Sequence, residues 1–529
     1  MLAACLLWPV SLAAQQSGKK QRAKTVPPAN AAALQEAAAH LQAGRLREAE
    51  VVARQIIKDN PRNADAHSLL GVILDQQQQI AAAENEYRTA LRLNPNLVSA
   101  LANLGVLLAR TQRAGEAITT LEKVVRLAPA HPQANFNLGF LYAAQGDYTK
   151  AIAPLEKVAD NEDPSVALLL VNSYFRVGRK ADALNRADKI AQAATHEPAI
   201  LFNLGLTLAE AGEYERAAHA FARTDEIRPN TAEVLYNLGI ARYNLDRLDE
   251  AAQSLNTAAT LAPNTPEIFY RLGLVESARG RSVAAIDQWL KALTLRNTYP
   301  EANFLLAEEL VKNKRNEQAL EFYERAVQQD PEKFLYYIRW AAVRFRAKQY
   351  EEARDIFLRA QEKFPTAPEL HYFIGMAARG AGTYDVAESE LKKALAAQPN
   401  NADALAHLGF IAVERDQPQE AERILRQVIS MSADHFPAHY DLGRLFVRTK
   451  RYAEALPFLQ KGAELSPNDP GVHYQLFLAF SRLKRKEEAE KELKIFRGLQ
   501  PENKQDAEPD KNATLPTDLP NVPEVPKKP

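Results

Sequence analysis

The residue types that most often carry chemistry are present, but they do not form a catalytic or metal-binding pattern. His435 and His439 are the closest of the ten histidines, and no third ligand accompanies them, so a structural role is the stronger interpretation. Residues 178–180 (GRK) lack the second glycine and upstream strand of a phosphate-binding loop. The acidic pairs at 351–352 and 487–488 are expected at solvated helix starts, where they favour the helix dipole. We therefore expect no enzyme activity, no cofactor and no metal site.

Side-chain amides suggest a different chemistry, because asparagine stands directly before a Leu-Gly pair at four places. An amide offers both a donor and an acceptor, so it can pair with a peptide unit of any sequence. Aromatic residues lie directly before most of these asparagines, and apolar residues follow three positions later. The candidate binding residues are Asn103, Asn137, Asn203, Asn237, Phe136, Phe140, Phe202, Tyr236 and Tyr270.

The elements that would position these residues are indicated by a repeat of 34 residues. Twelve of the thirteen steps between successive alanines in register are 34 residues long, and the step from Ala151 to Ala183 is 32. Such regular self-similarity indicates a repeat architecture. The alanines are Ala49, Ala83, Ala117, Ala151, Ala183, Ala217, Ala251, Ala285, Ala319, Ala353, Ala387, Ala421, Ala455 and Ala489.

Other residues keep the same phase. A small residue, often glycine as in Gly205, lies twelve residues before the alanine, and a proline such as Pro61 often lies twelve residues after an alanine. Apolar spacing predicts two amphipathic helices in each unit, closely packed at the small residues. The proline is expected to end the second helix. Glycines between the two helices suit a left-handed cap; they are Gly146, Gly178, Gly212, Gly280 and Gly382.

This combination of period, Leu-Gly, Glu-Ala and proline resembles the tetratricopeptide repeat family over roughly residues 30 to 500, in about fourteen repeats. The resemblance implies an all-α, right-handed superhelical solenoid of antiparallel helix pairs, with the first helices lining a concave groove. The first and fifth units depart from the pattern. Glu36 replaces the usual leucine, and Val171 replaces the usual glycine. The short step predicts a change in curvature near residues 160–166.

In this family the asparagine position faces the groove. The row therefore resembles the asparagine ladder in the repeat region of O-linked N-acetylglucosamine transferase, whose catalytic domain is absent here. Two alternatives stay open: asparagine is common at this position, and the aromatic rings can simply pack between neighbouring first helices. The Lys/Asn/Arg set of carboxylate-clamp adaptors is missing. Arg271, Arg339 and Arg444 suggest that the C-terminal half prefers acidic or polar partners.

Charge and composition restrict the class of partner. Lys+Arg and Asp+Glu are equal at 66 each, which argues against a general nucleic-acid binder because such a protein needs a basic face. The single cysteine, Cys5, excludes an intrachain disulfide framework. We therefore expect a protein or an extended peptide as the partner, and no nucleic acid. The oligomeric state is left open.

The two ends of the chain differ from the repeats. Residues 1–14 include a short apolar stretch that resembles a secretory signal, although no basic residue precedes it. A basic, polar linker at 15–29, a solenoid at 30–499 and a disordered, proline-rich tail at 500–529 follow. Export to the periplasm or cell envelope is the expectation, with a cytoplasmic location as the alternative. A membrane tether through the N-terminus is a further alternative.

Together these features predict a non-enzymatic scaffold that binds an extended partner segment in the concave groove. The alternative function is a structural or self-associating subunit of a cell-envelope assembly.

Overall fold

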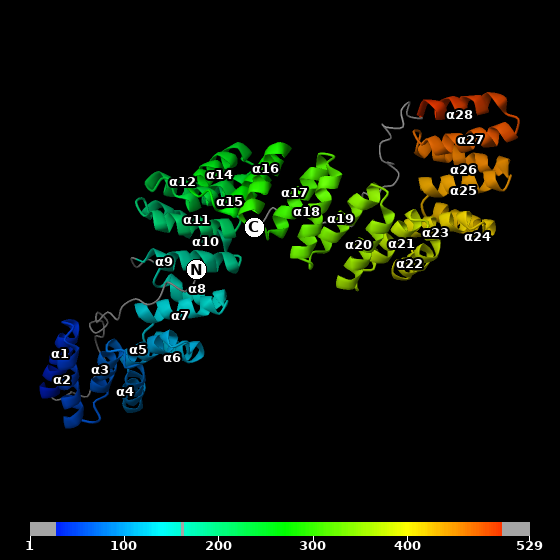
Figure 1. The fold of residues 1–529 in the computed structure, drawn as a ribbon. Coiled ribbons are helices and arrows are strands. Elements are labelled where there is room, and N and C mark those ends of the chain that lie inside the picture. The colour runs from blue at the N-terminus through cyan, green and yellow to red at the C-terminus, as the bar shows by residue number, and fades with distance from the viewer. Residues whose placement is uncertain (1–27, 160–162, 500–529) are drawn as a thin grey trace. The chain divides into compact units, whose positions relative to one another are not determined.

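The computed structural model describes residues 28–159 and 163–499, and all regular structure within these ranges is helical. The described chain contains 28 α-helices, in which a first helix and a second helix alternate fourteen times (Figure 1). It divides into two compact units, residues 1–261 (unit 1) and 262–529 (unit 2). The predicted signal-like segment (1–14) and proline-rich tail (500–529) lie outside the described residues. The first helix begins at Pro28, two residues before the predicted start of the solenoid.

The helices have similar lengths throughout. Unit 1 contains α1 (Pro28–Gln42), α2 (Leu46–Asp59), α3 (Ala64–Gln76), α4 (Ile80–Leu93), α5 (Val98–Arg110), α6 (Ala114–Leu127), α7 (Pro132–Ala144), α8 (Tyr148–Glu156), α9 (Pro164–Arg176), α10 (Lys180–Ala193), α11 (Pro198–Glu210), α12 (Tyr214–Ile227), α13 (Ala232–Asn244) and α14 (Leu248–Leu261). Unit 2 contains α15 (Pro266–Ala278), α16 (Ser282–Leu295), α17 (Pro300–Lys312), α18 (Asn316–Gln329), α19 (Phe334–Arg346), α20 (Tyr350–Lys363), α21 (Glu369–Gly380), α22 (Tyr384–Ala397), α23 (Ala402–Glu414), α24 (Pro418–Met431), α25 (Phe436–Arg448), α26 (Tyr452–Leu465), α27 (Pro470–Arg482) and α28 (Lys486–Leu499).

The alanines that define the period form the centre of each helix pair. Thirteen of the fourteen are 0% exposed, and the last, Ala489, is 5% exposed. Each lies in the first turns of a second helix, where a small side chain lets the first helix pack closely. The predicted repeat and its all-α solenoid fold are therefore confirmed.

The glycines of the first helices leave room for one large side chain of the second helix. A Cβ added at Gly205 would lie 2.6 Å from the ring of Phe221, and one added at Gly409 would lie 2.6 Å from Leu425. In both cases the opposing residue follows the glycine by sixteen positions. In the fifth repeat, where Val171 replaces the glycine, the residue sixteen positions later is Ala187, and both are buried. A larger residue on the first helix is thus matched by a smaller one on the second helix, so the space between the two helices stays filled.

The turn between the first and second helix always contains a residue with positive φ. The predicted glycines adopt this conformation, with φ between +71° and +80°. Gly44 also has φ +71°. Eight repeats place a side-chain-bearing residue there instead, and the sequence pattern missed them; these are Gln78, Gln112, Asp246, Lys314, Lys348, Asp416, Lys450 and Lys484.

Most second helices end as predicted, shortly before a proline, although α10, α16 and α24 have no proline at that position. Helix α2 ends at Asp59, and Asn60 adopts φ −141° directly before Pro61, because a residue before proline avoids the helical region. The exception in length is α8, which has nine residues where other second helices have fourteen, and which contains Pro154. This short helix lies at the predicted irregularity, ahead of residues 160–162, which are not described.

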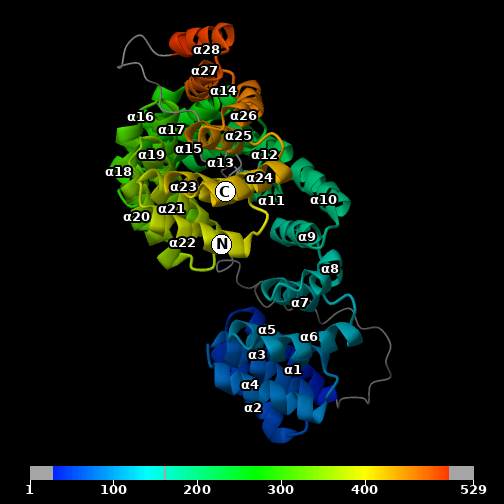
Figure 2. The ribbon, with the colours of Figure 1, turned by 90° about the vertical axis from the view of Figure 1, so that its right-hand side faces the viewer.

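First helices form one layer of each unit and second helices form the other. The backbones of several consecutive first helices lie close together, as those of α5 and α7 or α23 and α25 do, whereas no consecutive second helices lie as close within the described residues. In a curved stack the layer with the closer neighbours is the inner one. Figure 2 shows the same alternation of paired helices from a second direction. The first helices therefore line the inner face of each unit.

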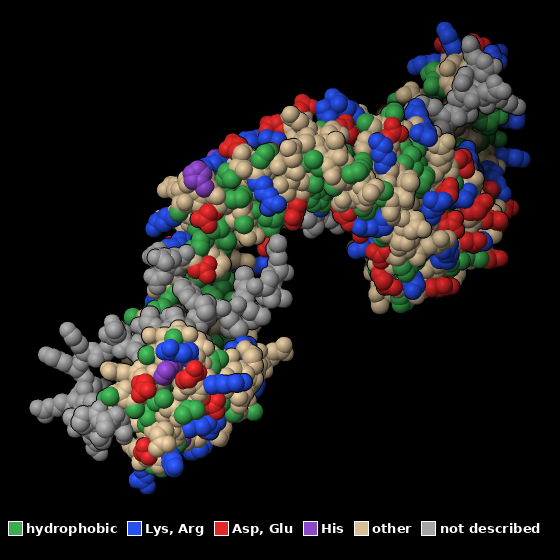
Figure 3. All heavy atoms as spheres, turned by 60° about the vertical axis from the view of Figure 1, so that its left-hand side comes forward, with side chains coloured by type: hydrophobic (Ala, Val, Ile, Leu, Met, Phe, Trp, Pro, Cys, Tyr) green, Lys and Arg blue, Asp and Glu red, His purple; other side chains and the backbone are tan. Residues whose placement is uncertain are grey.

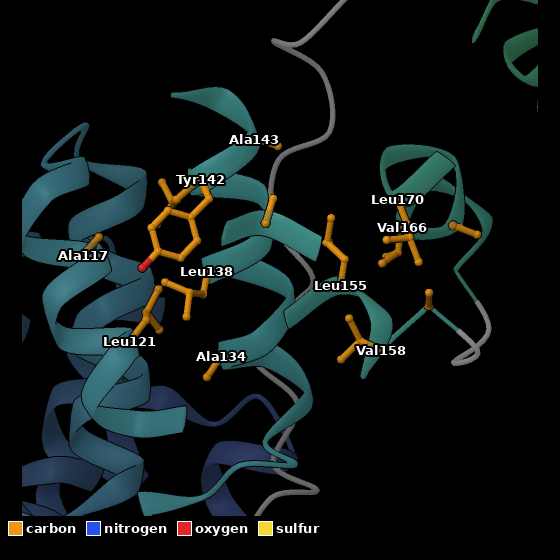
Figure 4. Close-up of a cluster of buried hydrophobic side chains, with 14 of the residues drawn as sticks. Ala117, Leu121, Ala134, Leu138, Tyr142, Ala143, Leu155, Val158, Val166 and Leu170 are labelled. Atoms are coloured by element: carbon orange, nitrogen blue, oxygen red, sulfur yellow. The ribbon is translucent and has the colours of Figure 1, made fainter. Parts of the chain in front are cut away.

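A continuous apolar core joins the repeats within unit 1. Between α6 and α9, the side chains of Leu121, Leu138, Leu155 and Leu170 are all buried (Figure 4). Since each repeat covers its neighbour's apolar face, stability depends mainly on contacts between adjacent repeats. Among the described helices, none combines the length and the hydropathy that a bilayer crossing requires.

Candidate protein-binding surface

The four predicted asparagines lie on the first helices α5, α7, α11 and α13 of unit 1, but their exposure differs. Asn203 is exposed, and Asn103 and Asn237 are half-buried. Asn137 is only 6% exposed. The structure thus places the row on the inner layer and varies how far each amide reaches solvent.

Two of these amides are partly satisfied by their own helices. Asn137 donates from Nδ2 to the Gln133 carbonyl at 2.7 Å, and Asn237 donates to the Glu233 carbonyl at 2.8 Å. These bonds fix the side chains and leave the Oδ1 atoms without a hydrogen-bond partner in the described structure. A partner backbone N–H is the natural donor to such an oxygen.

A neighbouring asparagine shows why the residue type alone is ambiguous. Asn135 lies on the same helix as Asn137, yet it is 0% exposed. Its Nδ2 donates to the carbonyls of Pro129 and His131 at 3.0 and 2.9 Å. It therefore ties the preceding turn to helix α7 and takes no part in the surface.

The predicted aromatic residues are half-buried on the same layer. In unit 1, Phe136 stacks on Phe140 with ring centres 6.4 Å apart, and Phe202 lies against Phe221 at 5.7 Å. In unit 2, Tyr270 stacks on Tyr299 at 5.0 Å. Half-buried rings can both fill the gap between first helices and present an edge to a ligand.

Farther along unit 2, the residues at the aromatic and asparagine positions belong to the packed layer. Phe304 is 5% exposed and stacks on Tyr336 at 4.6 Å. Tyr372 is 8% exposed, and its ring lies 5.8 Å from that of His407. The interpretation of these rings as packing between first helices applies best here.

Unit 2 carries a titratable cluster at the inner layer that the sequence pattern did not single out. Burial is the main cause that raises the pKa of Asp441 to about 6, and the guanidinium groups of Arg444 and Arg379 oppose it. Burial and the nearby Arg379 lower the pKa of His407 to about 3, so its imidazole is neutral at physiological pH. His407 and Asp441 occupy the position that holds asparagine in unit 1. Their place in the repeat could therefore have identified them from the sequence.

The outer layer shows paired charges. Arg113, which directly precedes α6, lies 2.8 Å from Glu84 on α4, and Arg451, which directly precedes α26, lies 2.6 Å from Glu422 on α24. Lysine and arginine are interspersed with aspartate and glutamate over the face drawn in Figure 3. A phosphate backbone would find no broad basic surface there.

No group of three or more metal-ligating side chains occurs within residues 28–159 and 163–499. His435 instead caps α25 by accepting from the Ala438 N–H at 3.1 Å, and its Nε2 lies 3.0 Å from Asp403. His439 contacts the Ala433 carbonyl at 2.8 Å. These contacts give both histidines of the closest pair a structural role.

The sequence matches models of the tetratricopeptide repeat family along most of its length. One model matches residues 34–97, 74–132, 102–166, 168–232 and 270–334. A second, with the same description, matches residues 208–271, 310–377, 378–445 and 412–464. With the fold described above, these matches show that the chain belongs to the tetratricopeptide repeat family.

Solved structures of helical repeat proteins are similar at low sequence identity. Naa15/Naa10 bound to HypK-THB gives 14% identity and a TM-score of 0.36, and the match covers 90% of this chain and 95% of that chain. Yeast Tom70 gives 16% and 0.31, covering 80% and 96%. The APC/C hetero-tetramer Cut9-Hcn1 gives 15% and 0.31, covering 85% and 94%. No curated protein matches the sequence.

Family membership supports a role as a protein–protein interaction scaffold, because tetratricopeptide repeat proteins are generally non-catalytic scaffolds. The identity of the partner segment depends on the side chains of the inner layer, since the fold alone does not determine function.

Proposed function

We propose that unit 1 binds an extended, largely uncharged segment of a partner protein along the first helices α5 to α13. The observation that carries this proposal is the row of amides beside half-buried aromatic rings on the inner layer. Asn103, Asn203 and Asn237 reach solvent, and the rings of Phe136 and Phe202 lie next to the row. The amides would pair with the backbone of the segment, and the rings would contact its apolar side chains.

The amide row can be tested without disturbing the core. Asn103, Asn203 and Asn237 are replaced together by alanine, and capture of partner proteins is measured by quantitative pull-down. Asn256→Ala serves as the matched control because Asn256 is exposed on the second helix α14. We expect capture to fall about tenfold in the triple variant only, which corresponds to losing several modest hydrogen bonds. Unchanged capture with intact helicity would exclude the amide row as the binding element.

We further propose that the protein is exported. This proposal rests on the apolar stretch at residues 2–14, which lies outside the described structure. Sequencing the N-terminus of the mature protein tests it. A mature chain that retains residues 2–14, recovered from the cytoplasm, contradicts it.

A further inference from the structure

Four arginines on the first helices of unit 2 share a buried Nε–H that has no hydrogen-bond acceptor. They are Arg271 on α15, Arg339 on α19, Arg379 on α21 and Arg444 on α25. Within the described residues of unit 1, no arginine has a buried nitrogen that lacks a hydrogen-bond acceptor. Buried donors are nearly always paired, so a row of unpaired ones on one layer indicates a missing acceptor.

These arginines also lack close carboxylate partners, with one exception. Arg271 and Arg379 form no ion pair within the described residues. Arg339 Nε lies 3.8 Å from Glu308 Oε2, which is too long for a hydrogen bond. Only Arg444 is paired: it lies 2.8 Å from Glu414 and 3.3 Å from Asp441.

Aromatic rings hold three of the guanidinium groups in place. The ring of Phe410 on α23 is contacted by Arg379 from α21, at 4.7 Å to the ring centre, and by Arg444 from α25, at 5.1 Å. Arg271 lies 5.7 Å from the ring centre of Tyr270. Such contacts reduce the conformational freedom that an arginine loses on binding a ligand. Burial also lowers the pKa of Arg379, and the carboxylate of Asp441 opposes this effect only in part.

We propose that the inner layer of unit 2 binds an acidic segment of a partner protein, whose side-chain carboxylates accept hydrogen bonds from Arg271, Arg339, Arg379 and Arg444. A carboxylate has two coplanar oxygens, which match two parallel N–H donors of a guanidinium. The proposal concerns other helices than the amide row of unit 1, and it stands if the proposal for unit 1 fails.

The residues between the arginines favour an acidic peptide over a nucleic acid. Aromatic side chains and the carboxylates of Glu308, Glu414 and Asp441 separate the four guanidinium groups. A segment whose acidic residues are spaced by apolar ones fits this alternation, whereas a continuous phosphate backbone would meet the carboxylates. Asp441 lies against Arg444 and therefore competes with the incoming acidic residue.

The test uses the full chain and two fluorescent peptides that differ only in charge. One carries a glutamate at every fourth position among alanine, leucine and serine, and the other carries glutamine instead. Affinity is measured by fluorescence anisotropy at pH 7.5 and about 50 mM salt, where charge interactions are weakly screened. We expect the acidic peptide to bind at least about tenfold more tightly.

Variants assign the effect to the arginines. Arg379→Gln should weaken acidic-peptide binding by about tenfold, because the unpaired guanidinium is lost. Asp441→Asn should tighten it about threefold, because the competing carboxylate is removed. Arg482→Gln, an exposed arginine on α27, is the control and should change affinity less than about twofold. Each variant is first checked for an unchanged helical signal, and the melting temperature confirms that none is destabilised.

Several outcomes would overturn the proposal. Equal affinity for the two peptides, or an equal loss in the Arg482→Gln control, would exclude the four arginines as a specific site. Comparable binding of a single-stranded oligonucleotide with the same number of charges would indicate a general polyanion surface. Binding seen only after residues 500–529 are removed would show that the occupant is this chain's own C-terminal segment and not a separate partner.

Discussion

Asn137 in unit 1 and Asp441 in unit 2 occupy the same place in their repeats, each fourteen residues before the buried alanine. Both side chains are 6% exposed. The amide of Asn137 is satisfied by a carbonyl of its own helix, whereas Asp441 depends on the guanidinium group of Arg444. This position therefore carries only neutral side chains in unit 1, whereas in unit 2 it includes titratable ones.

The difference at this position indicates that stability and recognition depend on different positions of the repeat. The alanines and the glycine contacts are the same in both units. The core residues therefore cannot determine which unit a partner binds. The asparagine position and its neighbours vary without disturbing that core. Four predictions test whether the two sets of positions are in fact independent.

The largest effect is expected where the units are alike. Gly205→Val in unit 1 and Gly409→Val in unit 2 should each destabilise by about 3 kcal/mol, because the new side chain overlaps Phe221 or Leu425. Urea unfolding followed by circular dichroism measures the change. Adding Phe221→Ala should restore part of the loss in unit 1, since it reproduces the arrangement of Val171 and Ala187. If only one unit were sensitive, the cores would not be equivalent.

The next effect is a change in stability that has opposite signs for matching substitutions in the two units. Asp441→Asn should stabilise the protein by about 2 kcal/mol at pH 7.5, because burial raises the folded-state pKa of Asp441 to about 6, above its unfolded value. The ionised form is therefore destabilising. Its cost is fully present above the folded pKa and disappears as pH falls through 6 toward 4. Asn137→Asp should do the opposite at pH 7.5, since it buries an unpaired charge.

Urea unfolding at pH 7.5 and at pH 4.5 checks both substitutions. The difference between wild type and Asp441→Asn should shrink at the lower pH. A constant difference across this range would show that the carboxyl does not titrate in the folded state.

The two proposed binding surfaces should differ in how strongly salt weakens their binding. Raising the salt from about 50 to about 200 mM should weaken binding of the acidic peptide by about tenfold, because screening acts on its ion pairs. Capture by the amide row of unit 1 should change less than about twofold. Anisotropy and pull-down in the same buffers measure the two responses. Equal salt dependence would remove the distinction between the units.

The smallest effect concerns the turns between helices. Unit 1 places glycine in the left-handed turn in four repeats, whereas unit 2 places lysine there in four. Lys348→Gly should stabilise by about 1 kcal/mol, because lysine is strained at φ +61°. Gly212→Lys should destabilise by a similar amount, although nothing lies within 4 Å of the new Cβ. Thermal unfolding measures both changes, and a gain in stability for Gly212→Lys would contradict the role of φ.

Much of the fold followed from the sequence because its signals are local and recur. The buried alanines, the prolines after the second helices and the five turn glycines all lie where the period placed them. The lysines and glutamines in left-handed turns were missed because, among these residue types, only glycine indicates a positive φ in the sequence. The compensation between Val171 and Ala187 was also missed, although a fixed separation of sixteen residues links the partners.

The candidate binding surface was predicted less completely. The sequence located the inner-layer positions through the family resemblance and named the asparagines, the aromatic rings and three of the four arginines. It did not distinguish the buried Asn135 from the partly solvated row beside it, because both are asparagines on one helix. The sequence also did not predict the roles of Arg379 and Asp441, because their burial depends on neighbouring repeats.

By itself the sequence determined the number of repeats, the helix pairs and the residues at their centre, since these depend on contacts within one period of the chain. Only the tertiary structure decided which polar side chains are buried, which are paired and which arginine donors lack an acceptor. The reason is physical: desolvation and charge pairing on the inner layer depend on side chains from adjacent repeats, about 34 residues apart, whose directions no local pattern records.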